Sequence, residues 1–168
     1  MKIKDALTWF KTNFGPKLEP AVAGTPFSID MLTAIAYQES GEVWPMLVDK
    51  QLGIPKILEL CVGDTLDGGN AFPRSKAELL AAPQGQAMFR IARQSLVDMA
   101  QYITGYQRVA RNPNKFCHGF GIFHYDIQFF KDDPAFFAKE MVRFRRVHSQ
   151  TNRRVTSSDG QPQPVLEQ

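Results

Sequence analysis

The spacing of apolar residues along the chain predicts mostly helices. Near the start, apolar residues recur three and four positions apart over 4–14, as they do on one face of a helix. Gly15 and Pro16 follow directly, and proline removes a backbone donor, so we expect this helix to end there. A short second helix is then expected over 17–23.

A clearer helical pattern covers residues 28–40. Ser28 is a favourable N-cap because its hydroxyl can accept a hydrogen bond from the first turn, and Gly41 marks the end. The apolar positions form one stripe along this helix, made of Ile29, Leu32, Ile35 and Ala36.

Further helices are predicted downstream, separated by a turn-rich loop over 63–74. The most regular apolar repeat covers 85–103 and is expected to form the central helix. The other predicted helices cover 54–61, the segment from the capping Ser75 to Ala81, and a segment that begins at Asp132 or Asp133 and ends near 147.

Length and charge favour a single domain with a polar tail. The 168 residues, 43% of them hydrophobic, suffice for one compact core. The net charge of +3 is carried entirely by residues 143–168, which contain five arginines, whereas residues 1–142 are neutral. We therefore expect a domain over 1–147 and a solvated, disordered Arg-containing tail over 148–168, with a patch for anionic cell-wall polymers or nucleic acid as the alternative role of the tail.

The chain lacks several common signatures. No window approaches the roughly 18 apolar residues of a membrane span, and the charged start is not a signal peptide. Cys61 and Cys117 are expected to be buried free thiols, and the isolated histidines match no metal motif. We expect no metal, no cofactor and a monomer made in the cytoplasm.

Glu39 is the first residue that suggests chemistry. It follows Leu32 by seven positions and Ile35 by four, which places its carboxylate on the apolar stripe and predicts partial burial. It also lies in the last helical turn, where the macrodipole disfavours a negative charge. Both effects favour a protonated acid near neutral pH, as a general acid requires. A solvent-facing residue or a salt bridge is the alternative interpretation.

The segment from His118 to Asp126 reads HGFGIFHYD and combines glycines, aromatics, histidines and an acid. Glycines allow a backbone to approach a ligand closely, and sugar rings stack on aromatic faces. A buried β-hairpin or turn whose aromatic residues belong to the core is an equally good interpretation of this segment alone.

Together the two segments resemble the goose-type lysozyme and lytic transglycosylase superfamily, in which a helix ending in Glu-Ser is followed later by Gly-x-Gly-Leu-Met-Gln-x-Asp. The counterparts here are Glu39-Ser40 and Gly119 to Asp126. The resemblance covers about twenty residues. It implies a mainly α (α+β), lysozyme-like fold, with a small β or loop element lining the cleft opposite the Glu39 helix. It also implies cleavage of the β-1,4 bond between N-acetylmuramic acid and N-acetylglucosamine in peptidoglycan.

The resemblance assigns a role to each matching position. It makes Glu39 the catalytic acid and Asp126 the acid that orients water or supports positive charge. Among the substrate-binding positions, Ser40 steadies the helix end. Gly121, Ile122 and Phe123 form the floor of the cleft, and His124 and Tyr125 adjoin it. With no leader segment expected, the protein would reach the wall after lysis or by specialised secretion.

The sequence also departs from the family pattern. His124 replaces the usual Gln, and the 80 positions between Glu39 and Gly119 indicate an inserted helical region. In that insert, Asp64 or Asp67 could supply the second carboxylate in place of Asp126. Trp44 could be a sugar platform or a core residue.

Attack by water would give a lysozyme, and attack by the sugar's own 6-hydroxyl would give a transglycosylase.

Three other functions remain open at this stage. The same broad fold could serve a chitin or chitosan glycosidase. A noncatalytic wall-binding or phage structural protein could keep the cleft without turnover. A nucleic-acid-binding role through the Arg tail is weaker, because residues 1–142 offer no net positive charge.

Overall fold

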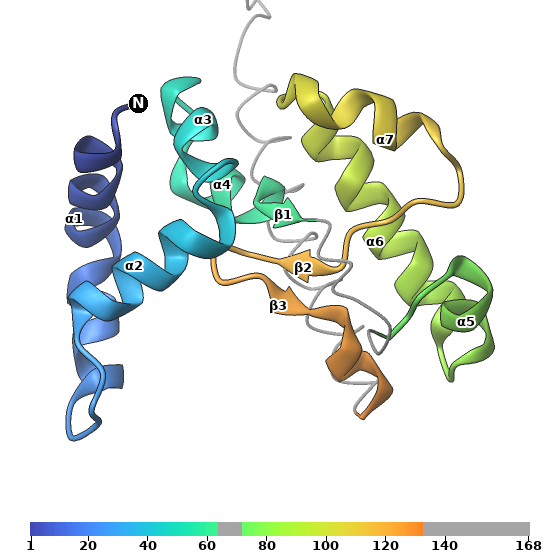
Figure 1. The fold of residues 1–168 in the computed structure, drawn as a ribbon, viewed down its shortest axis with the longest axis horizontal. Helices are drawn as coiled ribbons and strands as arrows, with labels where there is room; N and C mark the ends of the chain where they lie inside the picture. The colour runs from blue at the N-terminus through green and yellow to red at the C-terminus, as the bar shows by residue number, and fades with distance from the viewer. Residues whose placement is uncertain (64–71, 133–168) are drawn as a thin grey trace, which may run out of the picture.

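The computed structural model describes residues 1–63 and 72–132, and these form a mainly helical protein with one small sheet. The three-stranded sheet lies in the middle, with α1 and α2 on one side and α6, flanked by α5 and α7, on the other (Figure 1). The elements in chain order are α1 (Ile3–Val22), α2 (Ile29–Ser40), α3 (Trp44–Asp49), α4 (Ile54–Leu60), β1 (Val62–Gly63), α5 (Lys76–Ala81), α6 (Gly85–Ala100), the 3-10 helix η1 (Thr104–Tyr106), α7 (Gln107–Arg111), β2 (Gly119–Phe120), β3 (Tyr125–Asp126) and the 3-10 helix η2 (Ile127–Lys131).

Helix α1 continues through the predicted break, so the expectation of two separate helices was wrong. Pro16 and Pro20 lie inside it, and both are exposed. Gly15 is buried instead, and a Cβ at Gly15 would lie 3.9 Å from Cγ2 of Ile29. Packing against α2 therefore holds the helix together across its weak positions.

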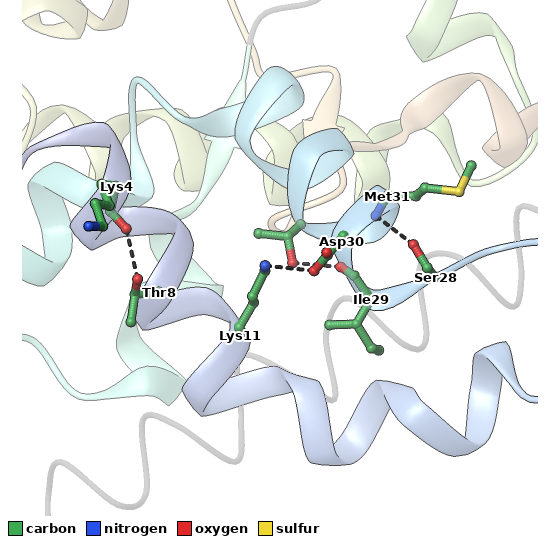
Figure 2. A network of polar contacts seen from close by, with 8 residues as sticks. Lys4, Thr8, Lys11, Ser28, Ile29, Asp30 and Met31 are labelled. Atoms are coloured by element: carbon green, nitrogen blue, oxygen red, sulfur yellow. Dashed lines mark hydrogen bonds and ion pairs between the residues drawn. The ribbon is translucent and has the colours of Figure 1, made fainter.

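Helix α2 begins where the sequence predicted. The Ser28 hydroxyl accepts a hydrogen bond from the Met31 amide at 3.2 Å (Figure 2). In the same view, Lys11 of α1 pairs with Asp30 of α2 at 2.6 Å. Both of these side chains are largely exposed, so the ion pair contributes little stability, and the apolar contacts near Gly15 hold the two helices together.

Three of the helices predicted downstream of α2 are also confirmed, those over 54–61, 76–81 and 85–103. Helices α4 and α5 match two of them, and Ser75 caps α5 by accepting from the Glu78 amide. Helix α6 is the core helix, with its apolar stripe buried. The short helices α3 and α7 were not predicted. Trp44 in α3 is fully buried, and its indole N–H donates to the Ala36 carbonyl at 3.4 Å, so it is a core residue and not a sugar platform.

An aromatic cluster joins the first three helices to the hairpin. Trp9 stacks on Trp44, with ring centroids 5.4 Å apart and planes at 24°. The edge of the cluster is Phe123, whose ring meets that of Phe10 at right angles. The members are Trp9, Phe10, Phe14, Tyr37, Trp44 and Phe123.

The sheet is antiparallel with the strand order β1-β2-β3. Phe120 pairs with Tyr125, and Val62 of β1 pairs with the same Phe120 from the other side. The turn between β2 and β3 uses Gly121 at φ 74°, a conformation that glycine adopts without strain, and closes with a hydrogen bond from the His124 amide to the Gly121 carbonyl. The predicted small β element is thus confirmed, and β1 is a third strand that was not predicted.

Several other predictions bear on residues beyond the sheet. Cys61 and Cys117 are buried thiols that are not joined in a disulfide, as predicted. Among the described residues, no helix is long and apolar enough to cross a membrane, and no group of side chains suits a metal ion. Asp64, Asp67, the helix predicted to end near 147 and the tail over 148–168 lie outside the described residues.

Candidate active site

Ser40 joins the two segments that the sequence singled out. Its side chain is buried, and its hydroxyl donates to the Ile122 carbonyl, 82 positions further along the chain, at 2.5 Å. The Cys61 thiol is also hydrogen-bonded to Ser40, and burial raises the pKa of that thiol to about 12, so it stays protonated. The end of α2 is thereby fixed to the hairpin turn.

Glu39, the residue before Ser40, is exposed, so the prediction of a partly buried carboxyl was wrong. The reason is the rotation of α2. The helix turns Thr33, Ala36 and Ser40 inward, whereas Ile35 of the apolar stripe is 38% exposed. Small residues on the buried face let the helix end approach the hairpin closely, and this leaves Glu39 beside the turn on the solvent side.

His124 lies on a floor of two glycines. A Cβ at Gly63 would lie 2.4 Å from His124 Cε1, and a Cβ at Gly119 would lie 2.7 Å from His124 Cβ. Both ring nitrogens are buried and have no hydrogen-bond partner among the described residues. Burial lowers the pKa of His124, and the charge of Glu39 opposes that shift, so the ring lies within electrostatic reach of the carboxylate.

The remaining hairpin residues take different positions. Ile122 is buried and so belongs to the core, and Gly121 is half-buried in the turn. Phe123 and Tyr125 are 41% and 47% exposed, which leaves both rings partly open to a ligand. Phe123 packs with its other side on the aromatic cluster.

Asp126 is half-buried on β3, paired with Gly119 in the sheet. Its Oδ1 accepts a hydrogen bond from the Gln128 amide at 2.7 Å and caps η2. The cap fixes the orientation of the carboxylate, and it also gives Asp126 a structural role that the sequence reasoning did not assign to it.

Phe129 is a site residue that the sequence reasoning missed. Its ring stacks on that of Tyr125, with centroids 5.0 Å apart and planes at 17°, although both residues are more than 40% exposed. The spacing of four positions between two aromatic residues was the available signal. The pair presents two roughly parallel rings beside Asp126.

A separate hollow of about 580 Å³ lies away from these residues, between α3 and η1. It is lined by Glu42, Met46, Asp49, Lys50, Tyr102, Ile103, Thr104, Gly105 and Tyr106. None of the candidate site residues is in this lining.

No protein-family model matches the chain, and neither a curated protein nor a solved structure matches it.

Proposed function

We propose that the protein cleaves peptidoglycan glycan strands at the β-1,4 bond between N-acetylmuramic acid and N-acetylglucosamine. The observation that carries this proposal is the hydrogen bond from Ser40 to the Ile122 carbonyl. It brings the Glu-Ser end of α2 against the glycine-aromatic turn, and the resemblance to goose-type lysozymes and lytic transglycosylases requires the same meeting of segments.

Glu39 is the proposed general acid. Its exposed carboxylate lies at the end of α2, which the Ser40 hydrogen bond holds to the hairpin, and a polysaccharide can reach it there. A bound glycan strand would cover this exposed carboxyl group, which then donates a proton to the glycosidic oxygen.

The exposed aromatic rings support a sugar ligand. Phe123 lies within the turn, and the stacked pair of Tyr125 and Phe129 follows it, with all three residues more than 40% exposed. Flat apolar faces of this kind pack against the C–H face of a pyranose ring. They would hold successive sugar units across Glu39.

The second half of the reaction returns the proton. After the leaving group departs, the Glu39 carboxylate acts as a base toward either water or the sugar's own 6-hydroxyl. Asp126, oriented by the Gln128 amide, is the proposed carboxylate that supports the positive charge at the sugar. On this proposal the chain from 1 to 147 is a lysozyme-like domain, in which the region between the two motifs extends the cleft.

The direct test compares Glu39→Gln with a matched control, Glu42→Gln. Both glutamates are exposed and lie three positions apart, but of the two only Glu39 acts on His124 by its charge. Purified peptidoglycan is incubated with each protein, and the soluble fragments are analysed by mass spectrometry. We expect digestion by the wild type and by Glu42→Gln, and loss of at least about 1,000-fold in rate for Glu39→Gln.

The fragments also distinguish the alternatives. Products one water lighter than hydrolysed fragments indicate transglycosylation, and hydrated products indicate a lysozyme. Digestion by folded Glu39→Gln at the wild-type rate would contradict the assignment of the acid. Cleavage of chitosan oligomers without cleavage of peptidoglycan would replace the proposed substrate, and binding to peptidoglycan without any product would indicate a noncatalytic wall-binding protein.

A further inference from the structure

His124 is an imidazole at a position where the motif that the sequence resembles has the neutral amide of Gln. We propose that His124 is a positioning residue. Once the substrate is bound, the His124 ring hydrogen-bonds to the carboxyl group of Glu39 and holds that group toward the scissile bond. The proposal rests on the proposed function, because it names the group that prepares Glu39 for that reaction.

The backbone around His124 is built to accept this ring. Gly63 of β1 and Gly119 of β2 lie beneath it, and a side chain at either position would overlap the ring or its Cβ. His124 itself is at φ 45°, a left-handed conformation that is unfavourable for a residue with a side chain. Two strands and a strained turn together fix the position of the ring.

The polar atoms of the ring have no hydrogen-bond partner in the part of the chain that the structure describes. Both nitrogens are buried, and neither is hydrogen-bonded to a described residue. An apolar ring would fill the same space without burying unpaired nitrogens. A buried polar group that is held in place and has no partner over 1–63 and 72–132 is therefore available for a partner that arrives in the functional state.

Glu39 is the charged group that acts on the ring. Its charge favours the imidazolium form of His124, against the larger effect of burial. The contacts from β1 and β2 come from glycines, which carry no charge, and the nearest acid on the same hairpin, Asp126, is hydrogen-bonded to the Gln128 amide. The geometry agrees, because Ser40, the residue after Glu39, is hydrogen-bonded to the Ile122 carbonyl, two positions before His124.

An NMR titration tests the pairing without any measurement of activity. The ring proton signals of His124, assigned by their absence in His124→Gln, are followed against pH in the wild type, Glu39→Gln and Glu42→Gln. We expect a lower pKa for His124 in Glu39→Gln, because the neutral amide no longer favours the imidazolium, and no change in Glu42→Gln. An unchanged pKa in Glu39→Gln would overturn the proposal.

Kinetics test the positioning role. His124→Leu removes both nitrogens at similar size, and His124→Gln restores a neutral hydrogen-bonding group. We expect a loss of roughly 100-fold in kcat for His124→Leu with little change in KM. The variant misplaces the catalytic acid but leaves substrate binding unchanged. His124→Gln should recover most of the lost kcat.

The possible outcomes separate this proposal from the proposed function. Wild-type kcat in folded His124→Leu, or a raised KM at unchanged kcat, would contradict positioning while leaving Glu39 as the acid. Full activity in Glu39→Gln would contradict the proposed function, whatever the titration gives. If His124→Leu does not fold, the titration of wild type and Glu39→Gln still decides whether the two groups interact.

Discussion

The Ser40 hydroxyl and the Ile122 carbonyl form a hydrogen bond that fixes the end of α2 to a turn more than eighty positions away. The bond is buried, so neither partner can exchange it for water. It therefore determines where Glu39 stands relative to the hairpin, and its removal should affect stability and activity together.

Replacement of Ser40 tests that link. We expect Ser40→Ala to lower the free energy of unfolding by about 1–3 kcal/mol, because it leaves the buried Ile122 carbonyl unpaired. Thr33→Val in the same helix is the control, since Thr33 bonds only to its own helix at the Ile29 carbonyl, which keeps its backbone partner. Urea unfolding measures both. An equal loss in the two variants would show that the link to the hairpin adds nothing.

The glycine under His124 should not tolerate a side chain. A Cβ at Gly119 would lie 2.7 Å from His124 Cβ and 3.2 Å from its Cα, and neither atom can move without the backbone. We expect Gly119→Ala to destabilise the fold by about 1–3 kcal/mol. Gly105→Ala, which meets nothing within 4 Å, should be close to neutral in the same thermal denaturation experiment. A neutral Gly119→Ala would contradict the tight packing of the ring.

Gly15 should behave in the opposite way. It lies inside α1, and a Cβ there would be in ordinary contact with Ile29 at 3.9 Å. Because glycine is an unfavourable residue inside a helix, we expect Gly15→Ala to stabilise the protein by about 0.5–1 kcal/mol, seen as a higher denaturant midpoint. A loss of stability would mean that α1 and α2 approach each other more closely than described here.

The lowered pKa of His124 predicts a pH dependence of stability. Burial holds the folded-state pKa below the ordinary 6.5, so the unfolded chain takes up a proton first as the pH falls. Stability should therefore decrease as the pH is lowered through 6.5 toward the folded-state pKa. His124→Gln should lack this decrease, and chemical denaturation of both proteins between pH 7.5 and about 5 measures the difference. Parallel curves for the two proteins would contradict it.

The sequence predicted most helices because their signals are local. Ser28 and Ser75 mark the starts of α2 and α5, and the regular apolar repeat marks α6. The break expected at Gly15-Pro16 is absent because packing against α2 outweighs local preference. Strand β1 could not be predicted, since its two residues are a strand only through pairing with Phe120 and Gly119, far along the chain.

The candidate site was predicted in part. The sequence predicted the hairpin opposite the Glu39 helix, and the Ser40 hydroxyl bonds to that hairpin, but the apolar stripe did not predict the exposure of Glu39. In α2 the buried face is distinguished by small side chains, which the hydrophobic pattern does not detect. The glycine floor under His124 also escaped, because Gly63 and Gly119 come together only through the sheet.

The stacking of Trp9 on Trp44 has an optical consequence. These are the two tryptophans of the chain, and their indole rings lie close and nearly parallel. Their excited states should couple, which gives the folded protein a distinctive near-ultraviolet circular dichroism band. Both tryptophans lie in the aromatic cluster, so the tryptophan emission reports on the surroundings of that cluster. Because Phe10 connects this pair to Phe123 at the hairpin, a ligand that moves the turn should change that emission without any added label.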